Sequence, residues 1–264
     1  MYVLVVSGSP RMEGLCHKIS MELANGVKSA GGDVELVLLA GKRIEACRAC
    51  GTTGCWSFME CSIQDDALEL RRKFNDCDAF ALVAPVYFLS VNGLTKNFID
   101  RMRYYGENGK PAAVAAVAGG TGKGCIYALQ EMCRWLVLVG FRPVSIMPVT
   151  RYNFETALVE ARFNGSKLVN INRQPFASLS EKLVYLESLP YMKYEATDEM
   201  LYLARQAIHA LARKGRIDLA GSLSYKIEEA ETLRRLGLHQ DALRLSVEVQ
   251  EESMRLFNSL MKSG

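Results

Sequence analysis

The chain has 264 residues, a net charge of +3 at pH 7 and a sequence pI near 8.4. That length suffices for one sizeable hydrophobic core, or for a core with an appendage. Because the positive charge is small and forms no basic stripe, we expect no nucleic-acid partner. The apolar runs are too short for a bilayer span or a signal peptide, so we expect a cytoplasmic protein with no membrane partner.

A buried strand at the start of the chain leads into a polar loop. Residues 2–6 (YVLVV) are apolar at every position, which favours a central strand of a parallel sheet covered by helices on both faces. The loop Ser7–Arg11 offers hydroxyls and a guanidinium, and the helix expected from about Gly14 adds unpaired N–H groups. A dinucleotide fingerprint and a P-loop are both missing. The loop therefore suits a monophosphate such as that of FMN, or is simply a strand-to-helix turn.

Apolar runs that predict strands alternate with helical patterns further along the chain. After a helix that ends at Gly31-Gly32, strands are expected at residues 34–39, 79–83, 111–117 and 144–149, with helices at 65–75, 93–103 and 126–138. Together with the first strand, this alternation predicts an α/β fold built on a doubly wound five-stranded parallel sheet.

Three loops at predicted strand ends carry suitable chemistry for one ligand. In a flavodoxin-like strand order, Ser7–Arg11, Pro85–Phe88 and Ala118–Gly124 converge on one crevice at the point where the strand order reverses. Tyr87 and Phe88 can pack on an isoalloxazine ring, and the glycines of the third loop let backbone N–H groups approach its edge. Each loop alone suits a structural role, but together they favour a flavin site.

Four of the eight cysteines lie in one loop, at Cys47, Cys50, Cys55 and Cys61. Without a signal peptide, reduced thiols or metal ligands are expected rather than disulfides. Four thiolates in a compact loop can hold a [4Fe–4S] cluster or a tetrahedral zinc ion, or they can stay unliganded. Trp56 and Phe58 could shield a cluster from water. The default role of the remaining cysteines is packing: Cys16, Cys77, Cys125 and Cys133.

The last 114 residues are less regular at their start. Residues 151–196 show poor periodicity, so we expect a functional or interface excursion there. A helix starting near Thr197 and ending at Gly215 is expected to be the last core helix. Residues 216–264 then predict a C-terminal helical hairpin. The expected domains are therefore residues 1–215, with the cysteine loop at 47–61 and the excursion at 151–196, and residues 216–264.

These segments, in this order, resemble the NADPH-dependent FMN reductase family and, within it, the iron–sulfur flavoproteins. The resemblance covers roughly the first 150 residues, and the matching segments are SGSPR (7–11), IEACRAC (44–50), QDDALEL (64–70), APVYFLSVNGLTKNFIDR (84–101) and VAGGTGKG (117–124). Iron–sulfur flavoproteins usually separate their second and third cysteines by fewer residues than lie between Cys50 and Cys55. Where relatives usually place a Ser or Thr to touch the phosphate, this chain has Leu15-Cys16, so backbone N–H groups are expected to take that contact.

The resemblance implies an FMN site and a cluster site on named residues. The implied FMN contacts are Ser7, Ser9, Pro10, Arg11, Gly14, Leu15, Cys16, Pro85, Val86, Tyr87, Phe88, Ala118, Gly119, Gly120 and Gly124. The implied cluster ligands are Cys47, Cys50, Cys55 and Cys61. We expect the cluster to lie beside the flavin crevice, where it would relay single electrons to or from FMN.

The leading hypothesis is an FMN-dependent oxidoreductase or electron-transfer flavoprotein carrying a [4Fe–4S] cluster. Its partners would be NAD(P)H or a redox protein such as ferredoxin. Because the cofactors perform the chemistry, no catalytic side chain is expected. The apolar surface of the last 114 residues predicts a homodimer or homotetramer. The alternatives are a cluster-free NAD(P)H:FMN or quinone reductase and, from another class, a flavin-free zinc-binding interaction module.

Overall fold

Five parallel strands form the centre of the structure, a computed structural model that describes residues 1–51, 55, 61–104 and 106–262. A short sixth strand, β4 (Ser90–Val91), pairs antiparallel with β3. The parallel strands follow the flavodoxin-like order β2-β1-β3-β5-β6, which confirms the predicted doubly wound sheet. Their bounds are β1 (Tyr2–Ser7), β2 (Asp33–Leu38), β3 (Ala79–Tyr87), β5 (Pro111–Ala118) and β6 (Arg142–Thr150).

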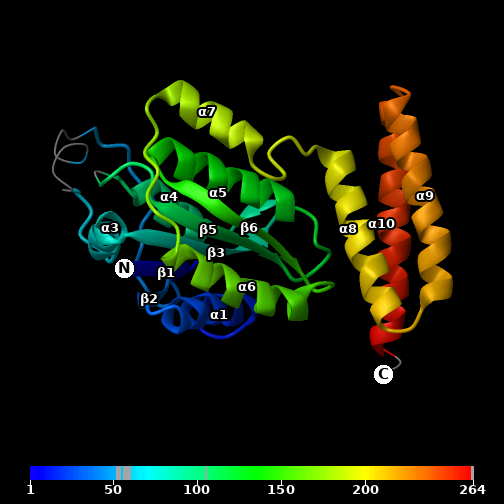
Figure 1. Ribbon diagram of the computed structural model, residues 1–264, viewed down its shortest axis with the longest axis horizontal. Coiled ribbons are helices and arrows are strands. Elements are labelled where there is room, and N and C mark those ends of the chain that lie inside the picture. The colour runs from blue at the N-terminus through cyan, green and yellow to red at the C-terminus, as the bar shows by residue number, and fades with distance from the viewer. Residues whose placement is uncertain (52–54, 56–60, 105, 263–264) are drawn as a thin grey trace.

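Helices cover both faces of this sheet (Figure 1). One face packs against α3 (Ala67–Asp76), α4 (Gly93–Arg101) and α5 (Cys125–Val139), and the other against α1 (Leu15–Ser29) and α6 (Phe154–Val169). Neighbouring residues of β3 therefore belong to different apolar clusters, Phe80 and Leu82 to the first, Ala81 and Val83 to the second. This double coverage explains why the strands are apolar at nearly every position.

The stretch expected to be a functional or interface excursion, residues 151–196, contains two helices that its poor periodicity did not predict. The first is α6, which completes the layer beside α1, and the second is α7 (Leu179–Ser188), which packs against α5. The inward face of α6 is built from small residues such as Ala157, Ala161 and Gly165 instead of large apolar ones. Its apolar periodicity is therefore weak, and the Asn-Gly pair that resembles a turn signal lies inside the helix.

Two glycines let α1 and α6 approach each other backbone to backbone. A Cβ atom on Gly165 would lie 2.0 Å from the carbonyl oxygen of Leu23. A Cβ atom on Gly26 would lie 1.9 Å from the carbonyl oxygen of Arg162. Because α1 follows β1 and α6 follows β6, and these strands are parallel, both helices begin at the end of the sheet where the strands end.

Three helices at the C-terminal end of the chain pack together at the side of the sheet where the strands end (Figure 1). They are α8 (Ala196–Arg213), α9 (Ile217–Arg235) and α10 (His239–Lys262). The fold therefore includes the predicted C-terminal helical extension. Within the described part of the chain, none of the helices is both long and apolar enough to cross a membrane.

The expectation that α8 is the last helix of the sheet core stays a prediction, and Tyr202 of α8 packs against the apolar cluster on the α5 face of the sheet. The buried α8 side chains Leu201, Ile208 and Leu211 pack with α9 and α10 in an apolar cluster separate from the two that cover the sheet. α8 therefore supplies the cover that the apolar faces of the hairpin need. The domain division after residue 215 stays a prediction.

Substituting Gly165 tests the close contact of α1 with α6. We expect Gly165→Ala to lower the free energy of unfolding by about 1–3 kcal/mol, because the added methyl group overlaps the backbone at Leu23. The matched control is Gly221→Ala in α9, where no atom lies within 4 Å of the added Cβ. The control should gain roughly 0.5–1 kcal/mol from helix propensity. Urea unfolding that showed equal effects for both variants would contradict the packing described.

Candidate functional site

A cavity of about 400 Å³ lies where the three predicted loops meet at the ends of β1, β3 and β5. Ten of the residues proposed for FMN line it: Ser9, Arg11, Gly14, Leu15, Cys16, Pro85, Val86, Tyr87, Gly119 and Gly120. Lys18 and Val117 line it too, and the sequence reasoning missed them. Lys18 follows Gly14 by one helical turn, and this spacing could have indicated that Lys18 faces the same cavity.

The first helix presents an open N-terminus to this cavity. Among the described residues, no side chain caps α1 at Gly14, and its first turn carries no acidic residue. The first N–H groups of a helix have no partner within the helix, and its dipole makes this end positive. With Arg11 and Lys18 in the same lining, this part of the cavity suits an anion.

Cys16 stands in the first turn of α1. The family that the sequence resembles usually has a Ser or Thr at this place. Burial raises the pKa of its thiol to about 12, an effect that the nearby Arg11 charge only partly offsets. The thiol therefore stays neutral at physiological pH and does not repel an anion.

Only one of the two expected aromatic residues lines the cavity. Tyr87, which is 45% exposed, belongs to the lining, whereas the side chain of Phe88 is wholly exposed and does not. Phe88 and Leu89 both have positive φ angles, 46° and 69°, in the two-residue turn that joins β3 to β4. Two positive φ values are typical of the tight turn that reverses a β-hairpin, and this turn removes Phe88 from the cavity.

Four other proposed FMN contacts also fall outside the cavity lining. Ser7 and Ala118 are buried inside the structure, and Pro10 is exposed. Gly124 precedes α5, and its N–H group donates to Glu199 Oε2 at 3.1 Å. A Cβ atom on Gly124 would lie 2.4 Å from the Cα atom of Leu89, so this position accepts no side chain.

Glu199 of α8 holds the start of α5. Its carboxylate is buried and accepts hydrogen bonds from the N–H groups of Gly124 and Ile126, the latter at 2.9 Å. Burial raises the pKa of Glu199, although these backbone hydrogen bonds partly offset the effect. The glycine-rich loop is thus tied to the C-terminal helices. Nothing in the sequence indicates this contact, because the partners lie more than 70 residues apart.

The four cysteines of the predicted metal loop line a second cavity, of about 170 Å³. Ser62 Oγ lies 3.4 Å from Cys50 Sγ, and Arg101 Nη2 donates to Cys61 Sγ at 3.4 Å. Within the described residues, no three His, Cys, Asp or Glu side chains are placed as the ligands of one metal ion. Trp56 and Phe58, expected to shield a cluster, lie outside the described residues.

A buried ion pair anchors both ends of this cysteine loop. Arg101, 1% exposed, forms two hydrogen bonds of 2.9 Å with the Asp65 carboxylate. The same guanidinium donates to the carbonyl oxygens of Glu45, before the cysteines, and Ile63, after them. Burial alone would raise the pKa of Asp65, but the hydrogen bonds from Arg101 and from the Glu45 N–H group lower it below its ordinary value.

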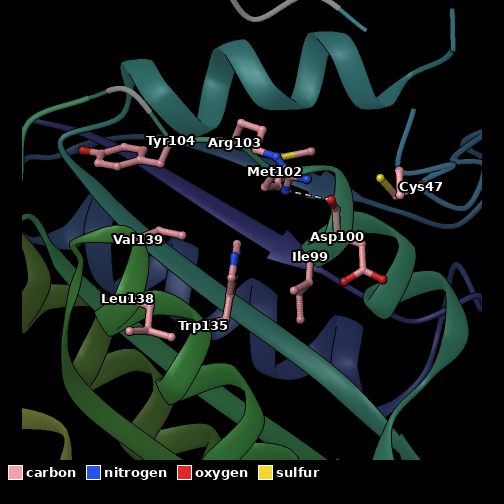
Figure 2. A pocket seen from close by; sticks show the side chains of 10 residues that line it. Cys47, Ile99, Asp100, Met102, Arg103, Tyr104, Trp135, Leu138 and Val139 are labelled. Atoms are coloured by element: carbon pink, nitrogen blue, oxygen red, sulfur yellow. Dashed lines mark hydrogen bonds between the residues drawn. The ribbon is translucent and has the colours of Figure 1, made fainter. Parts of the chain in front are cut away.

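The expected position of the cysteine loop beside the flavin crevice is wrong. Cys47 lines a third cavity, of about 640 Å³, together with Met102 and Tyr104 after α4 and with Trp135 and Val139 near the end of α5 (Figure 2). Because α5 runs back from the end of β5 to the start of β6, this part of the molecule lies where the strands begin. The cysteine cavity and the strand-end cavity share no lining residue.

Comparison with known proteins identifies the chain's relatives. The family model described as NADPH-dependent FMN reductase matches residues 1–148. An iron-sulfur flavoprotein of Archaeoglobus fulgidus is 38% identical over 122 residues, 45% of this chain and 54% of that protein. A second one from the same organism is 28% identical over 167 residues, 61% of this chain and 81% of that protein. The chain thus spans little more than half the length of the first relative.

A solved structure described as an NAD(P)H:quinone oxidoreductase from Methanothermobacter marburgensis has a similar fold. The TM-score is 0.53 and the sequence identity 20%, over 66% of this chain and 98% of that one. At this identity, the likeness supports the flavodoxin-like fold alone.

Substituting Asp65 tests the anchor of the cysteine loop. We expect Asp65→Asn to cost about 3–5 kcal/mol in urea unfolding at pH 7, because the buried Arg101 charge loses its counter-ion. Asp100→Asn is the control, because its ion pair with Lys96 is exposed and costs less than about 1 kcal/mol to remove. The stabilisation by Asp65 should be complete above its ordinary pKa of 3.8 and disappear as the pH falls through its lower folded pKa. Equal losses in the two variants would contradict the anchor.

Proposed function

Because the chain belongs to the NADPH-dependent FMN reductase family, we propose that it is an FMN-dependent oxidoreductase that takes electrons from NAD(P)H. The observation that carries the proposal is the strand-end cavity, in which ten residues from three separate segments of the chain surround one space beside an open helix N-terminus. Its volume of about 400 Å³ lies in the range of small-molecule sites.

The residues of this cavity divide into two groups with different chemistry. Ser9, Arg11 and the first N–H groups of α1 would hold the FMN phosphate, with Lys18 adding positive charge. Pro85, Val86, Tyr87 and the glycines of the third loop would hold the isoalloxazine, which supplies the hydride acceptor. The described residues that line the cavity include no Asp, Glu or His, so the protein's own part would be to bind, to orient and to keep water away.

We also propose that the cysteine loop carries a [4Fe–4S] cluster, held by Cys47, Cys50, Cys55 and Cys61. The support is that all four thiols border one cavity and that the relatives bear the name iron-sulfur flavoprotein. Arg101 would stabilise a thiolate at Cys61 through its hydrogen bond to the sulfur. Such a cluster would supply a one-electron centre, which fits ferredoxin or another redox protein as a partner.

The oligomeric state stays a prediction, a homodimer or a homotetramer. Exposed apolar side chains beside the strand-end cavity support it, namely those of Met12, Phe88 and Leu89. A neighbouring subunit that covered them would also shield the flavin ring from water.

Arg11 tests the phosphate end of the FMN site. We expect Arg11→Ala to weaken FMN binding roughly tenfold or more and to leave riboflavin binding unchanged, because only FMN carries the phosphate dianion. Fluorescence titration of the apoprotein measures both affinities. Lys28→Ala, at the other end of α1, is the control and should bind FMN like the wild type. Equal losses for FMN and riboflavin would show that Arg11 does not meet the phosphate.

Anaerobic reconstitution tests the cluster. We expect the wild-type protein to take up about four iron and four sulfide ions per chain. Cys55→Ala and Cys61→Ala should lose most of this iron, whereas Cys133→Ala, a buried cysteine of α5, should retain it. Metal analysis and the visible spectrum measure the outcome. Zinc in place of iron would favour the zinc reading, and no metal at all would favour a cluster-free reductase.

A further inference from the structure

The glycine-rich loop between β5 and α5 has one end fixed by the sheet. Ala118, the last residue of β5, pairs with Thr150 of β6. Gly119 and Gly120 follow it and line the strand-end cavity. Because glycine has more backbone freedom to lose than any other residue, these two need a second fixed point beyond them to keep one position. That point comes from helices outside the sheet.

Glu199 of α8 holds the far end of the loop. Its carboxylate, on a residue only 1% exposed, accepts hydrogen bonds from the N–H groups of Gly124 at 3.1 Å and Ile126 at 2.9 Å. Hydrogen bonds to an ionised acceptor are roughly twice as strong as neutral ones. The carboxylate also lies at the positive end of the α5 dipole. The start of α5, and with it the end of the loop, is therefore held by α8.

Two further contacts reach the middle of the loop. Gln250 of α10, which is also 1% exposed, donates from Nε2 to the carbonyl oxygen of Thr121 at 3.5 Å. Leu203 of α8 is fully buried and packs on Gly122, where an added Cβ atom would lie 2.6 Å from Leu203 Cδ2. The second half of the loop is thus in contact with α8 and α10.

These helices lie outside the part of the chain that matches the reductase family. The family model matches residues 1–148, whereas α8 and α10 lie at residues 196–213 and 239–262. Two residues, Gly119 and Gly120, separate the end of β5 from Thr121, which α10 contacts. A bridge this short between two fixed points has little freedom left. The C-terminal helices therefore help to determine where the two cavity glycines lie.

We propose that α8 and α10 belong to the flavin site, with Glu199 and Gln250 as positioning residues. They hold the glycine-rich loop in its binding position before FMN arrives, so that binding does not have to order the loop. Neither is among the described residues that line the strand-end cavity, so both act through the loop and not by contact with the flavin. The proposal rests on that cavity being the FMN site.

Fluorescence titration of the full-length apoprotein with FMN tests the part of Glu199. Glu199→Gln keeps the side-chain volume but turns an amide donor toward one of the two N–H groups, so we expect the Kd to rise roughly tenfold or more. Glu199→Asp keeps the carboxylate and should lose less affinity. Side-chain packing alone predicts the opposite order, because Asp is smaller. That opposite order, or equal affinity in all three proteins, would overturn the proposal.

Gln250→Leu tests α10 independently, because it removes the amide at similar volume. The Kd should rise roughly threefold or more, by the same factor for FMN and riboflavin, since the loop would meet the ring and not the phosphate. The control is Leu223→Ala in α9, a buried residue of the apolar cluster of the three helices. It should lower the urea unfolding midpoint and leave the Kd unchanged. An equal loss of affinity in this control would indicate general destabilisation and overturn the proposal.

NAD(P)H oxidation by the same FMN-loaded proteins separates this proposal from the proposed function. Flavin affinity that depends on Glu199 and Gln250, in a protein that oxidises no NAD(P)H, would support the positioning and count against the reductase function. NAD(P)H oxidation with equal flavin affinity in the wild type, Glu199→Gln and Gln250→Leu would overturn the positioning and leave the function standing.

Discussion

A parallel sheet buried on both faces determines where this protein can place its polar chemistry. Every residue of β5 is buried, and so are the first seven of β3, which leaves no room for a polar ligand along the strands. Polar and flexible segments can occur only where strands end and helices begin. The helices α1 and α6 follow the parallel strands β1 and β6, so both begin at the edge where the strands end. Among the described residues, no side chain caps either helix, so two open helix N-termini lie at one end of the molecule.

Two buried acidic residues hold the segments proposed to carry the cofactors, and they do so by different physics. Asp65 stays ionised beside Arg101, so the anchor of the cysteine loop depends on a charge pair excluded from water. Among the described residues, Glu199 makes no ion pair, and the N–H groups at the start of α5 hold it instead. The Asp65–Arg101 pair joins both ends of the cysteine loop to the end of α4. Glu199 joins the start of α5 to the C-terminal helices. Glu199 of α8 therefore helps to fix the position of the glycine-rich loop.

Large apolar runs and strand-end loops could be predicted from the sequence, because each is a local pattern. Helix α6 could not be predicted in this way, because apolar periodicity detects large side chains and the inward face of α6 contains mostly small ones such as alanine and glycine. The exposure of Phe88 depends on two backbone angles in a turn, which composition does not reveal. Glu199 was missed because its partners are distant in the chain.

The anchoring of the cysteine loop at both ends has a consequence for how its length can vary. Glu45 and Ile63 are fixed by the same guanidinium, so the entropy of closing the loop is set by the number of residues between them. That entropy grows only logarithmically with length, at about 0.6 kcal/mol for each doubling. Extra residues between Cys50 and Cys55 therefore change the stability of the fold very little. Spacings between the cysteines can drift among homologues while the sheet beneath them remains the same.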